Sequence, residues 1–293
     1  MALDSYTKAS TLYLPTKGDW NLLYDFLIKR FHHISIDEWK SRFANNKILN
    51  AEFKPLPINA PFVAGQKILY FREIDSEIEI PFQEFIIFED ENLVVADKPH
   101  FLPVTPTGKY VKETLLHRLI QTTQCHTLQP IHRIDRHTAG LVVFAKNIES
   151  RASYQNLFRD HAVFKKYEAI APALPHHQFP MTYSSRIVQG QQFFLSCVVE
   201  GSPNAITKIS VLEKHDIYWK YALEPVSGKK HQLRVQMHSL GAPLLNDAFY
   251  PIVDDELGDD WNRPLQLLAK EISFIDPCTQ QVRHFVSRQK LAW

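Results

Sequence analysis

The chain has 293 residues, a formal net charge of +1, 45% hydrophobic residues and 22% charged residues. This composition is that of an ordinary globular protein, long enough for two domains or one large mixed domain. Because the net charge is close to zero, the protein lacks the overall electrostatic signature of a nucleic-acid binder, and any anionic ligand must be held by a local group of cations.

Several other classes are excluded by simple features. The three cysteines, Cys125, Cys197 and Cys278, are odd in number and widely spaced, which argues against a disulfide framework or a thiolate metal site. The N-terminus lacks the apolar core of a secretory signal, and no stretch approaches the ~20 apolar residues that span a bilayer. We therefore expect a cytoplasmic protein with no membrane segment.

The N-terminal part predicts two helices followed by short strands. Residues 1–18 are polar and are expected to be a lead-in. Apolar residues then recur every three or four positions from Trp20 to Phe31, which predicts an amphipathic helix. Ser35 followed by Glu38 is a capping-box pattern and predicts that a second helix starts there.

A domain boundary is expected near residue 78. Short strands are predicted at 47–49 and 65–71, and the charged, proline-containing stretch 72–83 has the composition of a linker. The chain should therefore comprise a small N-terminal α+β domain at 1–78 and a larger domain at 79–293.

The larger domain is predicted to mix many strands with few helices. It opens with a strand, a tight turn and a strand over 85–97, and we expect a core strand at Leu141–Ala145, because this run is uninterrupted, apolar and rich in β-branched residues. Asn147 is a candidate cap for the helix that follows. The remaining predicted elements are helices at 114–120 and 230–240, strands at 165–171, 191–199, 205–212 and 218–223, and a closing hairpin at 272–286.

Asp135 is the first candidate for chemistry. It lies between Arg133 and Arg136 in the loop that leads into the core strand. A neighbouring cation lowers an aspartate pKa by about 1–3 units, which keeps the carboxylate ionised and available as a nucleophile. A purely structural ion pair would give the same local pattern.

The predicted helix at 230–240 is the second candidate. Its spacing puts Lys230, Arg234 and His238 on one face, opposite Leu233 and Met237. This face could be a solvated basic surface, or it could join other cations in the local basic patch that the net charge hides. Those other cations are Arg133, Arg136, Lys165, Lys166 and Lys229.

Metal and nucleotide chemistry are not expected. His132 and His137 flank Asp135, but no pair of histidines at helical spacing and no cluster of His and Cys accompanies them. The sequence also has no glycine-rich phosphate-binding loop.

Taken in order, these stretches resemble the RluA branch of the pseudouridine synthases. The family pattern H-R-L-D-x-x-T-S-G-L-L-x-x-A-K is similar to His132–Asp135, Thr138–Val142 and Ala145–Lys146. Further matches are Asp97–Pro99, Lys165–Ala169 for K-x-Y-x-A, Ser227–Met237 for T-G-R-T-H-Q-I-R-V-H-L, and Gly241–Asp247 for G-H-P-L-L-G-D. The resemblance covers about residues 85–286.

The resemblance implies an α+β pseudouridine synthase fold, with a mixed, largely antiparallel sheet and a central cleft. Asp135 would attack the target uridine, at the base or at the ribose, while Tyr167 packs on the flipped uracil and Arg234 pairs with the aspartate. Arg133 would fill the stack that the flipped base vacates. Other residues implied to contact RNA or assist flipping are His132, Arg136, Lys166, Lys229, Lys230 and His231.

The implied substrate is ribosomal or transfer RNA, with no metal, nucleotide or other cofactor, and a monomer is the default expectation. More weakly, the N-terminal part resembles the alpha-L RNA-binding domain that accompanies many of these synthases. Three departures from the family pattern stand out: Asn45-Asn46 in place of a glycine, Lys229-Lys230 in place of Arg-Thr, and Asn246 in place of a glycine.

Two other functions fit the same residues. A hydrolase could use Asp135 with a water molecule to release uracil, and product analysis would separate it from a synthase. A catalytically inactive RNA-binding or ribosome-assembly protein on the same fold is the alternative from another class, although Asp135, Tyr167 and Arg234 are all present.

Overall fold

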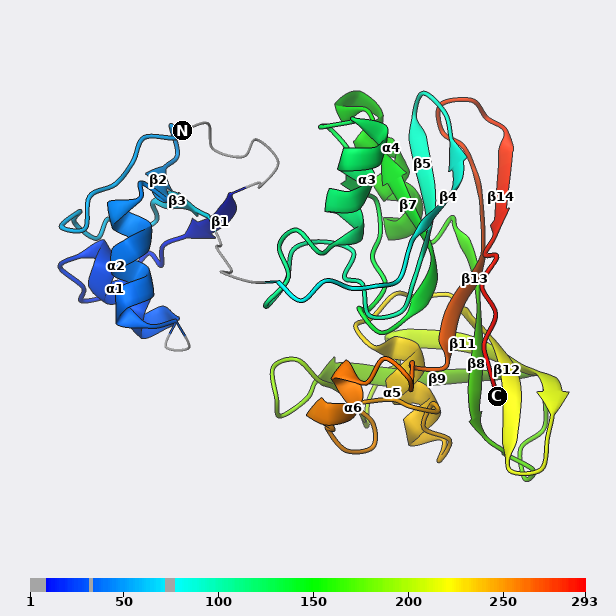
Figure 1. Ribbon diagram of the computed structural model, residues 1–293. Coiled ribbons are helices and arrows are strands. Elements are labelled where there is room, and N and C mark those ends of the chain that lie inside the picture. Colours follow the sequence, from blue (N-terminus) through cyan, green and yellow to red (C-terminus); the bar gives the residue numbers. More distant parts are fainter. Residues whose placement is uncertain (1–8, 32–33, 72–76) are drawn as a thin grey trace. The chain divides into compact units, whose positions relative to one another are not determined.

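The chain forms two compact units, Met1–Glu77 and Ile78–Trp293, in a computed structural model that describes residues 9–31, 34–71 and 77–293 (Figure 1). This division falls one residue before the boundary expected from the sequence. The centre of the expected linker, 72–76, lies outside the described residues, as do residues 1–8 of the expected lead-in. The end of that linker is held by the second unit, because Arg118 donates hydrogen bonds to the carbonyls of Ile80 and Phe82.

The first unit packs two helices with a three-stranded antiparallel sheet. Its elements are β1 (Ser10–Tyr13), α1 (Leu23–Arg30), α2 (Ile36–Ala44), β2 (Ile48–Asn50) and β3 (Lys67–Tyr70), and the strand order is β1-β3-β2. The Ser35 side chain accepts a hydrogen bond from the Glu38 amide at 3.1 Å, which confirms the predicted start of α2. The prediction of a lead-in up to residue 18 is wrong for β1, which pairs with β3 along its full length.

The second unit is built on one large mixed sheet. Its strands are β4 (Phe85–Glu89), β5 (Leu93–Lys98), β6 (Gln129–Pro130), β7 (Ala139–Ala145), β8 (Phe164–Pro172), β9 (Met181–Gln189), β10 (Ser196–Val199), β11 (Ala205–Lys214), β12 (Tyr218–Pro225), β13 (Leu267–Ile275) and β14 (Val282–Val286). The main path runs β10-β9-β11-β12-β8-β13-β7-β5-β4, with β14 on β13 and β6 on β7. Among these strands only β7 and β13 pair in parallel, which confirms the predicted α+β class with a largely antiparallel sheet.

Four helices accompany this sheet: α3 (Leu115–Thr123), α4 (Ile148–Arg159), α5 (Gln232–Ser239) and α6 (Asp255–Asp259). Figure 1 shows α3 and α4 beside β5 and β7, and α5 and α6 at the opposite end of the sheet, near β9 and β11. Each half has its own apolar cluster. Tyr154 of α4 packs with Val143 of β7, whereas Leu233 and Met237 of α5 pack with Tyr221 of β12.

Three local predictions need correction. Strand β9 was not expected from the sequence, although it lies between β10 and β11. Asn147 occupies the N-cap position of α4 without capping it, because its side-chain amide donates instead to Glu91 and Asn92 in the β4–β5 turn. Helix α5 begins at Gln232, so Lys230 precedes it rather than sharing its face with Arg234.

Within the described part of the chain, no helix combines the length and the apolar character that crossing a membrane requires.

Candidate active site

A cleft of about 960 Å³ opens in the second unit. Its lining comes mainly from four stretches of chain, 103–107, 131–138, 158–167 and 225–234. Each stretch adjoins a strand or helix of the sheet layer, so side chains far apart in the sequence face one space. Asp135, Tyr167 and Arg234 are all among the lining residues.

The loop that carries Asp135 is held from behind by buried polar groups. The ammonium of Lys98, whose side chain is fully buried, donates to the carbonyls of Pro99 at 2.8 Å and Arg136 at 3.0 Å. His100 Nδ1 lies 2.7 Å from the carbonyl oxygen of His137. These contacts fix the backbone on the C-terminal side of Asp135 and so limit the positions its carboxylate can reach.

Gly140 allows this loop to enter the sheet. It has φ +110°, and a Cβ atom there would collide with the backbone of Ala269, its partner in the parallel pairing of β7 with β13. A residue with a side chain fits neither the backbone conformation nor the close approach of the two strands. The glycine therefore belongs to the scaffold that positions Asp135.

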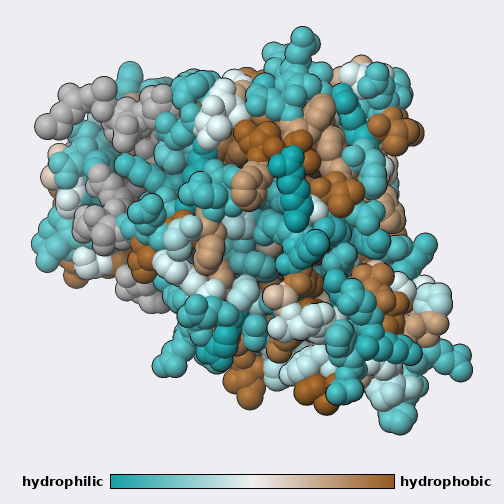
Figure 2. All heavy atoms as spheres, turned by 45° about the vertical axis from the view of Figure 1, so that its right-hand side comes forward, coloured by the Kyte–Doolittle hydropathy of each residue, from teal (hydrophilic) through white to brown (hydrophobic). Residues whose placement is uncertain are grey.

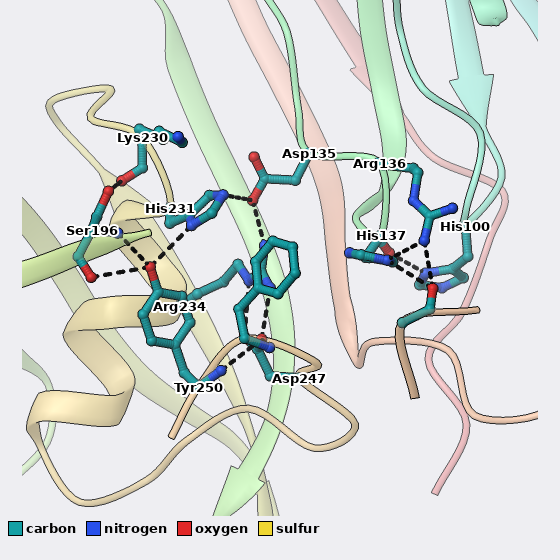
Figure 3. A network of polar contacts seen from close by, with 12 residues as sticks. His100, Asp135, Arg136, His137, Ser196, Lys230, His231, Arg234, Asp247 and Tyr250 are labelled. Atoms are coloured by element: carbon teal, nitrogen blue, oxygen red, sulfur yellow. Dashed lines mark hydrogen bonds and ion pairs between the residues drawn. The ribbon is translucent and has the colours of Figure 1, made fainter. Parts of the chain in front are cut away.

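Arg234 joins the two halves of the site (Figure 3). Its Nη1 donates to Asp135 Oδ2 at 3.0 Å, and its Nε and Nη2 form a two-pronged pair with Asp247 at 2.8 and 2.6 Å. The Arg234 side chain is 1% exposed and that of Asp135 is 31% exposed. The arginine is thus a fixed, buried charge, while the aspartate remains accessible from the cleft.

Aromatic rings enclose the Arg234 guanidinium. Its Cζ lies 4.7 Å from the centre of the Phe249 ring and 5.5 Å from that of Tyr250. Burial alone would lower the arginine pKa, but hydrogen bonding and charge from Asp247 raise it above its ordinary value. A guanidinium held in this way stays charged and presents its remaining donor toward Asp135.

The electrostatics of the site keep Asp135 ionised. Burial would raise the pKa of Asp135, but the neighbouring His231 and Arg234 outweigh it, so that the pKa lies below its ordinary value. The Nε2 atom of His231 is 3.9 Å from Asp135 Oδ2, and its Nδ1 is 2.9 Å from the Tyr250 hydroxyl. Because burial lowers the His231 pKa to about 4, this ring carries its charge only in the acid range where Asp135 itself titrates, and Arg234 supplies the positive charge at neutral pH.

The residues of the K-x-Y-x-A motif lie on opposite faces of strand β8. Lys165 and Tyr167 both line the cleft, as the alternation of side chains along a strand requires. Burial, and then the nearby charge of Asp135, raise the pKa of the Tyr167 hydroxyl. Lys166 lies on the other face, where its ammonium pairs with Glu271 at 2.9 Å. Lys166 therefore does not line the cleft, and its expected contact with RNA stays a prediction, whereas Lys165 is the lysine of this motif that faces the cleft.

The side chains next to Asp135 differ in exposure and in the contacts that hold them. Arg133 is exposed at the cleft. His132 is held in place by two contacts. Its Nε2 accepts a hydrogen bond from the Val143 amide at 3.1 Å, and its ring stacks on Phe158 with the ring centres 4.5 Å apart. Burial lowers the His132 pKa to about 3, which keeps this nitrogen an acceptor.

Arg136 also lines the cleft, but its guanidinium is engaged elsewhere. It donates to Asp259 at 2.8 Å and to the Tyr110 hydroxyl at 2.7 Å. Because Asp259 belongs to helix α6, its pair with Arg136 ties this helix to the loop carrying Asp135, and Asp259 also pairs with Lys109 at 2.8 Å. Both Nη atoms of Arg136 therefore have partners within the protein, and its expected contact with RNA stays a prediction.

The turn before α5 presents the remaining cations. Lys229 and Lys230 are exposed and line the cleft, whereas His231 is buried. The turn is fixed by Gln232, whose Oε1 accepts from the Lys229 amide and from the Ser227 hydroxyl. Of the two interpretations left open for α5, the solvated basic surface is wrong, because Arg234 is buried and paired with Asp135 and Asp247.

Sequence reasoning missed several members of the site. Asp247 was matched to a motif without a role, and Phe249 and Tyr250 were not considered. These residues contact Arg234 because the loop that follows α5 folds back onto that helix, and no local sequence pattern predicts this. Lys165 was named from the sequence only as one cation of the local basic patch. Its position two residues from Tyr167, and therefore on the same face of a strand, could have placed it beside Tyr167 in the cleft.

Comparison with known proteins identifies the family. Residues 92–239 match the family model described as RNA pseudouridylate synthase. An uncharacterized RNA pseudouridine synthase of Synechocystis is 30% identical over 231 residues, which cover 78% of this chain and 79% of that protein. The solved structure of human RNA Pseudouridylate Synthase Domain Containing 4 superposes with a TM-score of 0.56 at 27% identity, covering 71% of this chain and 88% of that one.

Relatives with named RNA substrates match over shorter stretches. The tRNA pseudouridine(31) synthase of Saccharomyces cerevisiae is 29% identical over 56% of this chain and 46% of its own length. The ribosomal large subunit pseudouridine synthase D of Haemophilus ducreyi is 29% identical over 64% of this chain and 59% of its own length. With a family model that covers the Asp135 loop, strand β8 and helix α5, this chain belongs to the RNA pseudouridylate synthase family.

Proposed function

We propose that this protein converts uridine in RNA to pseudouridine, with Asp135 as the nucleophile. The observation that carries the proposal is the pairing of a cleft-exposed Asp135 with the buried Arg234 at 3.0 Å, the arginine being held in turn by Asp247. A nucleophilic carboxylate must be ionised and reachable, and this arrangement supports both requirements.

The reaction is an isomerisation within the RNA. Asp135 attacks either C6 of the uracil or C1 of the ribose, the bond between ribose and base nitrogen breaks, and the base turns before C1 joins its C5. Loss of the C5 proton and release of Asp135 then complete the product, so that nothing is hydrolysed and no cofactor is consumed. Tyr167 lines the cleft and is proposed to pack on the uracil.

The target uridine must leave its stack to reach this cleft. Extrusion costs a few kcal/mol and is easiest in a loop or another weakly paired region. Arg133, exposed beside Asp135, is proposed to occupy the space that the base vacates. Relatives named for transfer RNA and for ribosomal RNA make both RNA classes candidate substrates.

We further propose that the N-terminal unit is an RNA-binding domain of the alpha-L type. Helix α1 ends in the exposed cations Lys29 and Arg30, which could contact phosphates. A monomeric state and a cytoplasmic location also stay predictions.

Mapping pseudouridines in total cellular RNA, with and without the gene, tests the proposed activity. One or more sites should disappear with the gene and return when the wild-type protein, but not an Asp135→Asn variant, is restored. Incubation of the purified protein with the RNA so identified should yield pseudouridine. Free uracil or an abasic site would instead identify a hydrolase.

A further inference from the structure

Phe193 exposes an aromatic ring, and its backbone contacts Lys230, one of the residues that line the cleft. It lies in the loop between β9 and β10, and of the large apolar side chains that the structure describes it is the most exposed, at 78%. Exposure alone does not indicate a function, because apolar groups are scattered over the mainly hydrophilic surface in Figure 2. What distinguishes Phe193 is how its loop is held and what surrounds it.

The loop is a tight, hydrogen-bonded turn. The Gly190 amide donates to the Leu195 carbonyl at 3.0 Å, and the Leu195 amide donates to the Gln192 carbonyl at 2.9 Å. The loop is joined to the cleft lining through Lys230, whose ammonium donates to the Phe193 carbonyl at 3.2 Å. The Ser196 hydroxyl donates a hydrogen bond to the Lys230 carbonyl at 2.9 Å, a contact visible in Figure 3.

A row of aromatic rings links this loop to the proposed active site. The Phe193 ring lies edge-on to Phe194 at 5.4 Å, and Phe194 packs on Phe249 at 5.6 Å. Phe249 in turn covers the guanidinium of Arg234. The exposed ring therefore contacts Phe194, which in turn packs on the ring that covers the partner of Asp135.

We propose that Phe193 stacks on a base of the RNA strand that flanks the flipped uridine, while Lys229 and Lys230 contact the adjacent phosphates. This inference rests on the proposed function only in taking RNA as the ligand. An exposed ring beside cations is the combination that binds unpaired nucleotides, because every base has a face on which to stack and every nucleotide carries a phosphate. The two lysines favour an anionic strand over an apolar protein partner.

The test compares two RNA stem–loops of identical stem, one with uridines in its loop and one whose loop nucleotides lack bases. Phe193→Ala should weaken binding of the base-bearing RNA about 5- to 150-fold, the range expected for loss of one base–aromatic stack, and should leave the abasic RNA unaffected. Phe193→Trp should keep the wild-type affinity for both. Phe85→Ala, which removes an exposed phenylalanine of β4 that does not line the cleft, is the matched control and should change neither.

Equal affinities of Phe193→Ala and wild type for the base-bearing RNA would overturn the proposal, as would an equal loss on both RNAs. Failure of the wild type to distinguish the two RNAs would overturn it as well. The proposed activity is judged separately by pseudouridine formation in total RNA. A base-dependent loss of binding in a protein that forms no pseudouridine would therefore support the stacking site and reject the enzyme.

Discussion

Asp135 and Arg234 are 99 residues apart in the chain, and their side chains are 3.0 Å apart in the fold. The arginine receives its orientation from Asp247 and its enclosure from Phe249 and Tyr250. Each of these residues therefore acts on the proposed nucleophile through one guanidinium. The motif around Asp135 could be read from the sequence, but the residues that fix its partner could not.

Asp135→Asn should abolish turnover while preserving fold and RNA affinity, because the amide keeps the shape of the carboxylate but cannot act as its nucleophile. Single-turnover pseudouridine formation and RNA binding should be measured on the same preparation. Asp37→Asn, which changes a 94% exposed aspartate of the first unit, serves as the control and should retain full activity. If the Asp135→Asn variant formed substantial product, Asp135 would not be the nucleophile.

The pH dependence of kcat/KM should report how strongly the Arg234 guanidinium lowers the pKa of Asp135. The ionised form of Asp135 is the reactive one and its pKa is lowered, so kcat/KM for the wild type should fall only at pH values below the ordinary aspartate pKa of about 3.9. Arg234→Lys keeps a positive charge but cannot reproduce the hydrogen bonds to both aspartates, so the Asp135 pKa should rise. The acid limb of the profile should then move to higher pH. An unchanged limb would show that Arg234 does not control this ionisation.

At the scale of elements, local patterns predicted what local forces determine. The Ser35 cap of α2 and the apolar strand β7 depend on neighbouring residues and were found correctly. Strand β9 was missed because its buried positions include Ser185, which weakens the apolar alternation. Asn46 and Asn246 replace expected glycines and both have positive φ, 57° and 60°, a conformation that asparagine tolerates better than most residues.

Gly140→Ala tests the contact between β7 and β13. The new methyl group would strike the Ala269 backbone at a φ of +110°, so stability should fall by more than about 1 kcal/mol and activity should fall with it. Gly228→Ala is the matched control, because nothing lies within 4 Å of its Cβ position and its φ lies outside the left-handed region. Thermal unfolding of both variants measures the difference. Equal stability would mean that the strands separate at little cost.

Neutralising the turn before α5 should alter the salt dependence of binding. Lys229→Gln combined with Lys230→Gln removes two exposed cations from the cleft. If both contact phosphates, RNA affinity should fall and the plot of log affinity against log salt should lose about 0.7 of slope for each single-strand contact. Lys166→Gln provides the comparison, because Lys166 faces away from the cleft and pairs with Glu271. An unchanged slope in the double variant would place these lysines off the RNA.

At the scale of the whole molecule, the chain divides into a unit with the proposed chemistry and a unit without it. The first unit has its own core around Leu23, Trp39 and Ile68, and residues from Ile80 onward are held by the second. The length allowed two domains or one large domain, and the linker-like stretch 72–83 indicated two. The near-neutral total charge concealed the cations gathered at the cleft.

Neutralising Lys29 and Arg30 tests the proposed RNA contact of the first unit. Lys29→Gln with Arg30→Gln should weaken affinity for substrate RNA but leave the single-turnover rate of bound RNA unchanged, because both side chains lie outside the unit that contains the cleft. Lys40→Gln, another exposed cation of this unit, tests whether position on α1 matters. An unaltered affinity of the double variant would reject the contact.

Strand β13 has a consequence for how the protein is made. It lies between β8 and β7, so the half of the sheet that carries Asp135 and the half that carries Arg234 are joined through residues 267–275. During synthesis, the strands of both halves of the sheet emerge from the ribosome before β13, the strand that joins them. Assembly of the cleft must therefore wait until residues 267–275 have been synthesised, and its contacts span long sequence separations, which slow folding. Until then the nascent chain exposes the unpaired edges of β7 and β8, the stage at which it is most vulnerable to misassociation.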